Sequence, residues 1–268
     1  MPELPEVEVV RRQLERVWVG RRIENVWAAK PSYFFVTSPR TLVANLTGKR
    51  TVALVRHGKY ILAELDDSSR LLCHLGMTGQ MTTRAIEHDS HVHLTLGLSG
   101  QKTVSFRDVR KFGKVEWIAP GHSSPRLDKL GPDALDATRA QLEDGFRARR
   151  VAVKSALLDQ KVLAGVGNIY ADEALFAARI SPLRPASSLS ADELTRLARQ
   201  VRRILKTSVE RGGSTINDYI QPDGELGGYQ NWHRVYGKTG EPCPRCKAPL
   251  VRVVVGGRSS HFCPKCQT

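Results

Sequence analysis

The sequence Cys243-Pro-Arg-Cys246 is followed, after sixteen residues, by Cys263-Pro-Lys-Cys266. Two Cys-x-x-Cys pairs separated by about 15–20 residues are typical of one tetrahedral zinc site, because each pair offers two thiolates from one tight turn. The segment between the pairs has the length of a β-hairpin. Two disulfides or four reduced thiols are the alternative. Four thiolates leave no open position for water or substrate, so we expect one structural zinc ion and look elsewhere for chemistry.

The charge of the chain favours a polyanionic partner. Its 268 residues carry 41 Lys and Arg against 27 Asp and Glu, a net charge of +14. Such an excess attracts nucleic acid most simply, although it also favours solubility or adhesion to a membrane surface. Seven Lys and Arg lie between Trp232 and the end of the chain, against one acid, Glu241. A second basic cluster comprises Arg147, Arg149, Arg150 and Lys154. Basic charge on a zinc module indicates phosphate contacts.

Other features of the composition bear on location. The sequence has no run of about eighteen apolar residues, so we expect no transmembrane helix. Its acidic opening lacks the apolar core of a signal peptide. Cys73 stands alone in an apolar stretch and is expected to be buried. An unpaired cysteine beside a thiolate metal site suits a reducing cytosol, and the absence of heptads favours a cytoplasmic monomer.

The first part of the chain is expected to be rich in β-strands. Residues 3–17 have apolar side chains at helical spacing and acidic residues at their start, which predicts an amphipathic helix. Short β-rich runs separated by turn residues then extend from about residue 22 to residue 118, as in an antiparallel sandwich. The predicted strands are Thr51–Val55, Tyr60–Leu65, Leu71–Leu75, Val92–Leu96, Thr103–Phe106 and Val115–Ile118.

The second part of the chain is expected to be helical. A Pro- and Gly-rich stretch at 120–125 has the composition of a linker. Helices are predicted over residues 138–148, 153–159, 168–177, 190–211 and about 215–220. We therefore predict an α+β chain with two domains. They are a β-sandwich domain over 1–120, a linker over 121–134, and a helical domain over 135–268 with a zinc finger at 234–268.

The N-terminal residues could supply a nucleophile. Removal of Met1 would leave Pro2 with a secondary amine, and an α-amine titrates near pH 8, at about 7.7–8.0. Such an amine can attack an electrophilic carbon and form an iminium, and the neighbouring Glu3 could move a proton. A proline and an acid also begin ordinary helices, and these residues alone favour that simpler interpretation.

The opening Met1-Pro2-Glu3-Leu4-Pro5-Glu6-Val7-Glu8 resembles the N-terminus of the bacterial formamidopyrimidine-DNA glycosylase family, which repairs 8-oxoguanine. The resemblance extends along essentially the whole chain, through further motifs in the family's order. These are His57-Gly58-Lys59-Tyr60, His74-Leu75-Gly76-Met77-Thr78-Gly79, Arg110-Lys111-Phe112-Gly113, Gly165-Val166-Gly167-Asn168-Ile169-Tyr170, Val235-Tyr236-Gly237 and the terminal zinc finger.

The resemblance implies four catalytic residues. Pro2 matches the nucleophile that attacks the sugar C1′ after the base has been flipped out of the stack. Glu3 matches the acid that assists base release and sugar ring opening. Lys59 matches a lysine associated with β-elimination and with phosphate contact. Arg258 matches the arginine of the zinc hairpin that holds the phosphate beside the lesion and is linked to δ-elimination.

The resemblance also implies residues that bind DNA. Met77, Arg110 and Phe112 match the three residues that fill the gap left by the flipped base. Two of them are apolar wedges, and the arginine offers a donor fork to the orphaned base. Asn168 opens the second helix of a helix-two-turns-helix motif, where backbone N–H groups can approach a phosphate. Further expected DNA contacts are His74, His91, Arg149 and Tyr236.

Three departures from the family's pattern qualify these expectations. Val109 replaces a common proline and Lys111 a common arginine, which puts the preference for the opposite base in doubt. The alignment of His88 and His91 with the family's histidine-rich segment is open. Residues 214–219 occupy the region that caps the flipped base in relatives, where the sequence varies.

The resemblance implies a bifunctional DNA glycosylase and abasic-site lyase that excises 8-oxoguanine and formamidopyrimidines from double-stranded DNA. A related alternative is an endonuclease VIII-like glycosylase for oxidised pyrimidines, although the Pro-Glu-Leu-Pro-Glu opening favours the purine branch. A different alternative is a non-catalytic protein that binds damaged DNA on the same scaffold. A zinc-ribbon transcription or RNA-binding factor would leave the first 120 residues unexplained.

Overall fold

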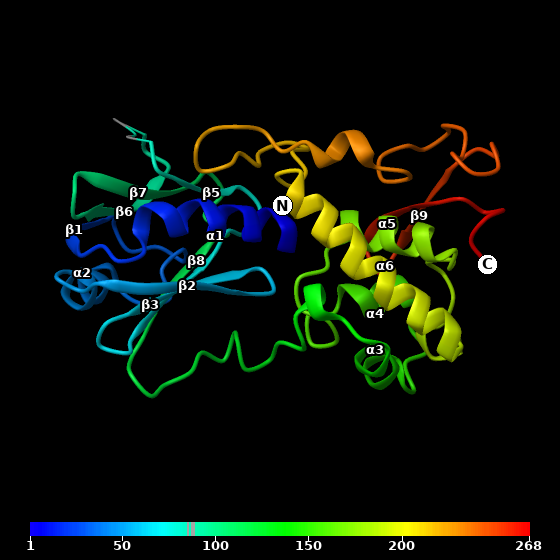
Figure 1. Cartoon of the computed structure of the whole chain (residues 1–268), viewed down its shortest axis with the longest axis horizontal. Helices are drawn as coiled ribbons and strands as arrows, with labels where there is room; N and C mark the ends of the chain where they lie inside the picture. Colours follow the sequence, from blue (N-terminus) through cyan, green and yellow to red (C-terminus); the bar gives the residue numbers. More distant parts are fainter. Residues whose placement is uncertain (85, 87–88) are drawn as a thin grey trace. The chain divides into compact units, whose positions relative to one another are not determined.

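The computed structural model describes residues 1–84, 86 and 89–268, and the chain divides into two compact units (Figure 1). The first unit comprises Met1–Asp128 and Arg211–Gln230, and the second comprises Lys129–Glu210 and Asn231–Thr268. The chain therefore leaves one unit for the other after Asp128, after Glu210 and after Gln230.

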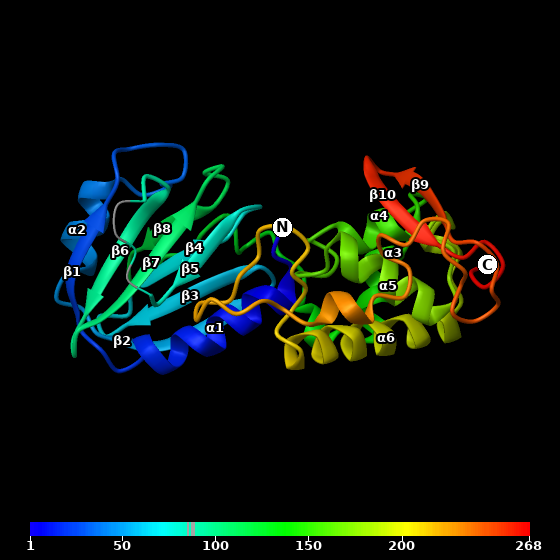
Figure 2. The ribbon, with the colours of Figure 1, turned by 90° about the horizontal axis from the view of Figure 1, so that it is seen from above.

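The described part of the first unit contains two four-stranded antiparallel sheets, ordered β1-β6-β7-β5 and β2-β3-β4-β8. The helix α1 contacts β2 and β3 of one sheet and β7 of the other, and it lies alongside β2 in Figure 2. This arrangement confirms the predicted antiparallel sandwich with a flanking helix. The elements are α1 (Leu4–Trp18), β1 (Ile23–Ala28), α2 (Pro39–Leu46), β2 (Thr51–His57), β3 (Tyr60–Leu65), β4 (Arg70–His74), β5 (Gly79–Thr82), β6 (Val92–Leu98), β7 (Lys102–Asp108) and β8 (Lys114–Ile118).

The core of the first unit lies between the sheets and α1. Leu14 and Trp18 of α1 are fully buried with Phe34 and Phe106, whose rings meet edge to face at 4.9 Å. Cys73 belongs to the same cluster, as its apolar sequence context predicts. Burial raises the pKa of the Cys73 thiol to about 12, so this cysteine remains an uncharged core residue.

The first turn of α1 is stabilised by a pair of reciprocal hydrogen bonds. The Glu3 side chain accepts the backbone N–H of Glu6, and the Glu6 carboxylate accepts the backbone N–H of Glu3 at 2.8 Å. This capping box satisfies two donors that a helix start otherwise leaves unpaired. Proline at N1 or N2 fits the same turn, because proline lacks the N–H that would be unpaired there.

The second unit is helical and ends in a two-stranded hairpin (Figure 1). In that hairpin Arg258 pairs with Val255 across a two-residue turn, Gly256-Gly257, in which both glycines have positive φ, 55° and 74°. Such a turn matches the twist of the flanking strands. The elements are η1 (Ala134–Asp136), α3 (Arg139–Phe146), α4 (Val153–Leu158), α5 (Asn168–Ala178), η2 (Ala186–Ser188), α6 (Ala191–Glu210), β9 (Val251–Val255) and β10 (Arg258–Phe262).

The helix predicted near residues 215–220 is wrong, because side chains satisfy the backbone of this segment instead. Thr215 Oγ1 donates to the Tyr219 carbonyl at 2.9 Å and accepts the Gly227 N–H at 2.8 Å. Gln80 Nε2 donates to the Asp218 carbonyl. The segment 211–230 is thereby held as a loop against the first unit, and it ends in η3 (Tyr229–Trp232).

The elements β1, α2 and β5 were not predicted, nor were the short 3-10 helices η1, η2 and η3. A start signal for α2 is nevertheless present in the sequence, since Ser38 caps the helix through its hydroxyl and Pro39 opens it. None of the helices in the described part of the chain combines the length and the apolar composition that a membrane crossing requires.

His74 ends β4 and is held as a neutral imidazole. Burial lowers its pKa to about 4, and the nearby charges of Lys59, Arg126 and Lys114 act in the same direction. The neutral ring accepts the Gly76 backbone N–H on Nδ1 at 3.2 Å. His74 therefore depends on remaining unprotonated to hold the start of the loop that carries Met77.

The depressed pKa of His74 predicts a loss of stability in acid. An unfolded histidine titrates near pH 6.5, so between about pH 6.5 and 4 the unfolded chain binds a proton that folded His74 does not. The stability is complete above that window and falls as the pH falls through it, by about 1–3 kcal/mol at pH 4.5. Urea unfolding at pH 7 and pH 4.5 should show that His74→Gln loses less unfolding free energy between the two pH values than the parent protein does. His122→Gln, at an exposed position, is the control, and parallel losses in all three proteins would contradict this role for His74.

Candidate functional site

The N-terminus is anchored by α1 and by the loop that follows α6. Met1 is 53% exposed, whereas Pro2 and Glu3 are buried. Glu6, only 1% exposed, accepts the Ser214 backbone N–H at 2.7 Å on one oxygen and the Glu3 N–H on the other. The position of Pro2 is therefore set by two segments that lie 208 residues apart in the sequence.

Lys59 lies in the tight turn between β2 and β3, next to Gly58 with its φ of 55°. It is only 8% exposed, so most of its side chain is buried in this turn. Arg56 connects this turn to α1, because it donates to the Gly58 carbonyl at 3.0 Å and to Glu8 at 2.9 Å. Burial alone would raise the pKa of Glu8, but hydrogen bonds from Arg11 and Arg12 lower it overall. Sequence reasoning missed this ion cluster.

The three predicted wedge residues lie on two neighbouring loops of the first unit. Met77 and Phe112 are 38% and 42% exposed, so neither is a core residue. The Arg110 guanidinium lies 4.6 Å from the centre of the Phe112 ring. Lys111 between them adopts a positive φ of 59°, so this departure from the family's pattern lies in the bend of the loop.

Buried Asp108 joins the two wedge loops. One of its oxygens accepts the Thr78 hydroxyl, and the other accepts the Gly113 N–H at 2.7 Å. Thr78 Oγ1 also accepts the Arg110 N–H at 3.2 Å. Asp108 is fully buried, so removing its carboxylate would leave several buried donors unsatisfied. No sequence motif pointed to this residue.

The histidines predicted to contact DNA, His74 and His91, lie in different surroundings. His74 lies beside Lys59 and Tyr60, with its ring 4.7 Å from that of Tyr60. His91 is partly buried, and its carbonyl accepts the Asp108 N–H at 2.8 Å. His88 lies outside the described residues.

In the second unit, Asn168 begins α5 directly after Gly167, as predicted. Gln160 shapes the turn before it, because Gln160 accepts the Gly165 N–H and donates to the Val166 carbonyl, both at 2.9 Å. Asn168 Oδ1 is buried and has no hydrogen-bond partner among the described residues. Arg149 forms an ion pair with Asp159 at 2.9 Å while remaining partly exposed.

Not every member of the second basic cluster faces solvent. Lys154 is fully buried, so it does not contribute to a basic surface. Its ammonium is paired with Asp172 at 2.7 Å instead. A lysine at the start of a helix beside three arginines has the sequence pattern of a surface group, and only the fold shows its partner.

The zinc hairpin presents Arg258 at its tip. Arg258 is exposed and is the first residue of β10 after the Gly256-Gly257 turn. Tyr236 lies on the same unit, with its ring 5.1 Å from that of His261. Its backbone N–H donates to buried Glu173 at 2.9 Å, as do the two preceding residues.

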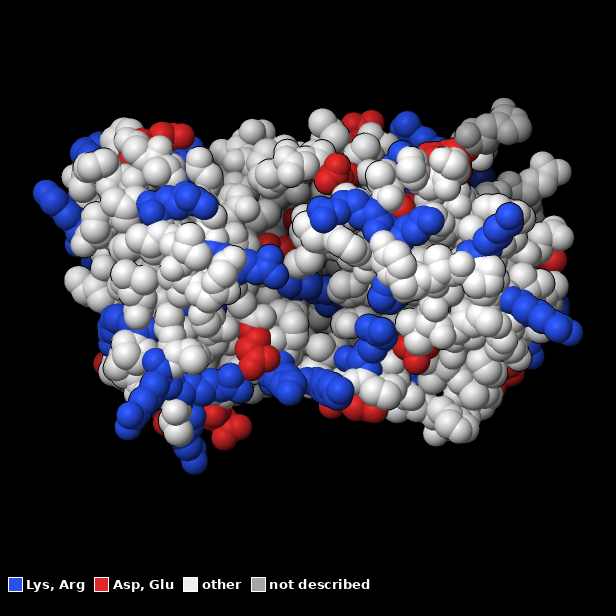
Figure 3. Space-filling view, turned by 180° about the vertical axis from the view of Figure 1, so that it is seen from behind, with Lys and Arg blue, Asp and Glu red and all other residues white. Residues whose placement is uncertain are grey.

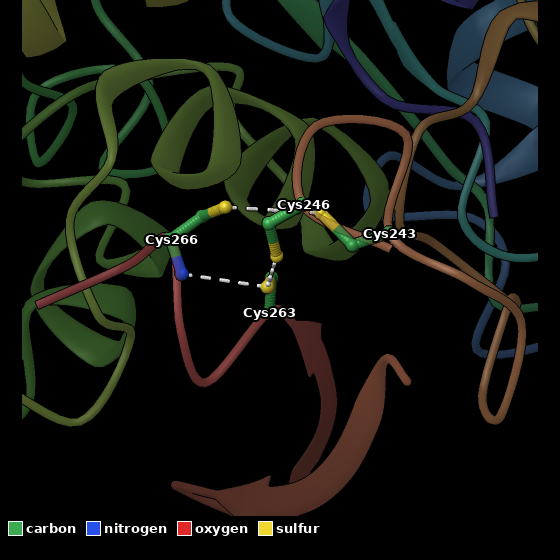
Figure 4. Close-up of side chains that lie close together, drawn as sticks. All are labelled: Cys243, Cys246, Cys263 and Cys266. Atoms are coloured by element: carbon green, nitrogen blue, oxygen red, sulfur yellow. Dashed lines mark hydrogen bonds between the residues drawn. The ribbon is translucent and has the colours of Figure 1, made fainter. Parts of the chain in front are cut away.

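The four terminal cysteines form one cluster whose sulfur atoms lie within 4.8 Å of one another (Figure 4). The Sγ atoms of Cys246 and Cys263 are 3.4 Å apart, and those of Cys243 and Cys266 are 3.9 Å apart. A tetrahedral zinc site with bonds of about 2.3 Å needs sulfur–sulfur separations of ~3.8 Å, so the cluster fits one ion. All four cysteines are free, which excludes the alternative of two disulfides in the described chain.

Four thiolates this close together need a compensating cation. The backbone N–H of Ala248 lowers the pKa of Cys246 to about 7, while the Cys246 side chain raises that of Cys266 to about 12. Neighbouring thiols cannot all ionise without a compensating charge. A divalent ion supplies that charge, so these residues suit structural zinc and leave no ligand position open.

Figure 3 shows exposed Lys and Arg side chains on the surface of each unit. This distribution agrees with the net charge of +14. Exposed cations, together with exposed apolar wedges, are typical of proteins that contact the phosphates and base steps of DNA.

Comparison with known proteins agrees with these features. Three family descriptions match in order: the Formamidopyrimidine-DNA glycosylase N-terminal domain over residues 1–115, its H2TH domain over 130–219, and a zinc finger found in FPG and IleRS over 240–268. A Formamidopyrimidine-DNA glycosylase of Paracoccus denitrificans is 45% identical, with all of both chains covered.

Solved structures agree as well. A Lactococcus lactis Fpg variant in complex with Fapy-dG DNA has a TM-score of 0.91 and 37% identity over the whole of both chains. The Lactococcus lactis Fpg in complex with abasic-site DNA has a TM-score of 0.90 and 37% identity, with 99% of each chain covered.

The sandwich, the helix-two-turns-helix motif and the zinc cluster thus define a zinc-finger DNA glycosylase of the repair class. The chain belongs to the formamidopyrimidine-DNA glycosylase family.

Gly76 allows the two wedge loops to approach each other. A Cβ at this position would lie 2.5 Å from the Gly113 nitrogen and from the Phe112 carbonyl carbon, and φ is +66°. Gly76→Ala should therefore displace the loop that carries Arg110, whereas Gly121→Ala bears only the cost of its positive φ, since no described atom lies within 4 Å of its Cβ. We expect Gly76→Ala to lose at least about 1 kcal/mol more stability in urea unfolding, with weaker binding of abasic-site duplex. Equal losses in the two variants would exclude a steric role for Gly76.

The cysteine cluster predicts a metal-dependent hairpin. Cys263→Ser removes one buried thiolate and should abolish stoichiometric zinc, because three remaining ligands hold a structural ion poorly. Metal analysis of purified protein checks this result, and Cys73→Ala, which lies outside the cluster, should retain one zinc per chain. Full zinc content in Cys263→Ser would contradict the assignment.

Proposed function

We propose that the protein is a bifunctional glycosylase and abasic-site lyase that removes oxidised purines from double-stranded DNA. The carrying observation is the Met1-Pro2-Glu3 terminus, which the Glu3 and Glu6 capping box holds at the start of α1. Removal of the exposed Met1 would give Pro2 a secondary amine at a fixed position. The relatives with Fapy-dG and abasic-site DNA support this substrate class and this product.

The proposed reaction begins with the Pro2 nitrogen. Its lone pair attacks C1′ of the flipped nucleotide, and the bond between C1′ and the base breaks as the base leaves with its electron pair. Glu3 is the proposed proton carrier that assists base release and opening of the sugar ring. The result is an iminium that joins Pro2 to C1′, as in Schiff-base enzymes.

The iminium makes the two phosphates leave in turn. Loss of a proton from C2′ expels the 3′ phosphate by β-elimination, and a second elimination expels the 5′ phosphate. Lys59 is proposed to assist the first elimination and Arg258 the second, while each contacts a phosphate. Hydrolysis of the resulting iminium returns the amine of Pro2.

The remaining residues are proposed to bind DNA. Met77, Arg110 and Phe112 would fill the space of the flipped base, and their exposure on adjoining loops supports this role. Asn168 would donate from its side-chain amide group to a DNA phosphate, at a helix start whose backbone N–H groups favour the same anion. Contacts in supporting positions are proposed for His74, His91, Arg149 and Tyr236. The structural zinc would hold the hairpin that carries Arg258, and we propose that one chain acts alone.

Covalent trapping tests the role of Pro2. Borohydride reduces an iminium, so incubation with 8-oxoguanine duplex should give a stable adduct that peptide mapping places on Pro2. Pro2→Gly should reduce base excision by at least about 100-fold, because a primary amine on a flexible residue replaces the constrained nucleophile. Glu15→Gln on the exposed part of α1 is the control and should form the adduct normally.

Excision rates and the state of the N-terminus separate the alternative functions. Faster excision of thymine glycol than of 8-oxoguanine, measured with each base opposite the lesion, would favour an oxidised-pyrimidine enzyme. Retention of Met1 in the purified protein, with tight lesion binding and no adduct, would establish a non-catalytic binding protein.

A further inference from the structure

Two adjacent carboxylates on α5 are buried, which is unusual for acidic side chains on a helix. Asp172 is 1% exposed and Glu173 is 2% exposed. Neither residue belongs to the proposed catalytic or DNA-binding groups. Each accepts hydrogen bonds from a different segment of the C-terminal part of the second unit.

Asp172 is the centre of a buried network. One of its oxygens pairs with Lys154 Nζ of α4 at 2.7 Å, and both side chains are completely inaccessible. The other oxygen accepts the His261 backbone N–H at 2.9 Å and contacts His261 Nδ1 at 3.1 Å. Lys154 Nζ also donates to the Ser259 carbonyl at 2.6 Å. Two helices therefore bind β10 at residues 259 and 261.

A third contact lies at the tip of the hairpin. A Cβ on Gly256 would come within 2.6 Å of Ser155 Oγ, so the turn lies directly against α4. The contacts at Gly256, Ser259 and His261 flank Arg258 on both sides in the sequence. Arg258 itself remains exposed.

The zinc ion cannot hold this tip by itself. Arg258 lies five residues before Cys263, and a strand rises about 3.3 Å per residue, so the two are separated by ~16 Å. The metal fixes the base of the hairpin. Bending of a two-stranded ribbon over that distance would move an arginine at its tip unless a second anchor restrained it.

A buried ion pair is a poor source of stability alone, because desolvation of both charges offsets their attraction. Its attested use is to specify one arrangement, since a displaced partner leaves an uncompensated charge. The Lys154–Asp172 pair meets this description. The backbone N–H and the imidazole of His261 in β10 are the other polar groups that contact the Asp172 carboxylate.

We propose that Asp172, together with Lys154, is a positioning residue that fixes Arg258 for its phosphate contact through β10. This inference rests on the proposed function of Arg258. The zinc cluster and the Asp172 network then act as two anchors, one at each end of the hairpin. Glu173 restrains a different segment, residues 234–236, and so supplies a matched control from the same helix.

A double-mutant cycle tests the proposal. The variants are Asp172→Asn, Arg258→Ala and their combination, with Glu173→Gln alone and combined with Arg258→Ala as the control. Single-turnover cleavage of abasic-site duplex and the dissociation constant for an uncleavable analogue are measured for each. Zinc content and melting temperature are recorded alongside.

We expect Asp172→Asn to slow cleavage about 10- to 100-fold while retaining one zinc per chain, because Arg258 is displaced without loss of the metal. In the Arg258→Ala background the same substitution should have almost no further effect, since its target is absent. The fold-reductions in cleavage rate caused by Glu173→Gln and by Arg258→Ala should instead multiply in the combined variant, because Glu173 acts on another segment.

The outcomes separate the two claims. If Arg258→Ala cleaves and binds like the parent protein, the role of Arg258 and the positioning proposal both fail. If Arg258→Ala is impaired but the effect of Asp172→Asn on the cleavage rate multiplies with that of Arg258→Ala, only the positioning proposal fails. If Asp172→Asn loses zinc or unfolds, the double variant Lys154→Met/Asp172→Asn takes its place, because it removes both charges together. The same cycle with Arg258→Ala is then measured, and its outcomes are interpreted in the same way.

Discussion

The structure of the first unit depends on one buried carboxylate. Glu6 lies inside the protein, where an acidic group must be satisfied by donors. It receives two backbone N–H groups, one from Glu3 beside it and one from Ser214 in a distant segment. The start of α1 and the loop after α6 are therefore ordered by the same group. A chain end that would otherwise be free is converted into a fixed position, which any chemistry at Pro2 requires.

The regular parts of the fold could be predicted because their signals are local. The spacing of Cys243, Cys246, Cys263 and Cys266 predicted the metal cluster, and apolar periodicity predicted α1 and α6. The strand β3 was predicted at its observed bounds, Tyr60–Leu65. Residues 215–220 were assigned wrongly, because the bonds that hold them come from Gln80 and Gly227 rather than from a helical ladder. Such partners are distant in sequence and leave no periodic pattern.

The site was predictable only in its residues, not in what holds them. Resemblance pointed to Met77 and Arg110, but nothing in the sequence showed that Asp108 joins their loops. Charge composition placed Lys154 in a basic cluster. A lysine among arginines has the sequence pattern of a surface residue whether or not a buried acid lies beside it in the fold. The supporting groups are buried polar residues with long-range partners, and their type alone does not distinguish them from solvated ones.

The return of residues 211–230 to the first unit has a consequence for how the protein can be divided. A fragment that stops at Asp128 would contain the whole sandwich yet lack the amide that Ser214 gives to Glu6. The first unit is thus built from two segments of the chain, Met1–Asp128 and Arg211–Gln230. Truncation at the first linker should therefore leave the start of α1 with only one of the two amides that Glu6 accepts.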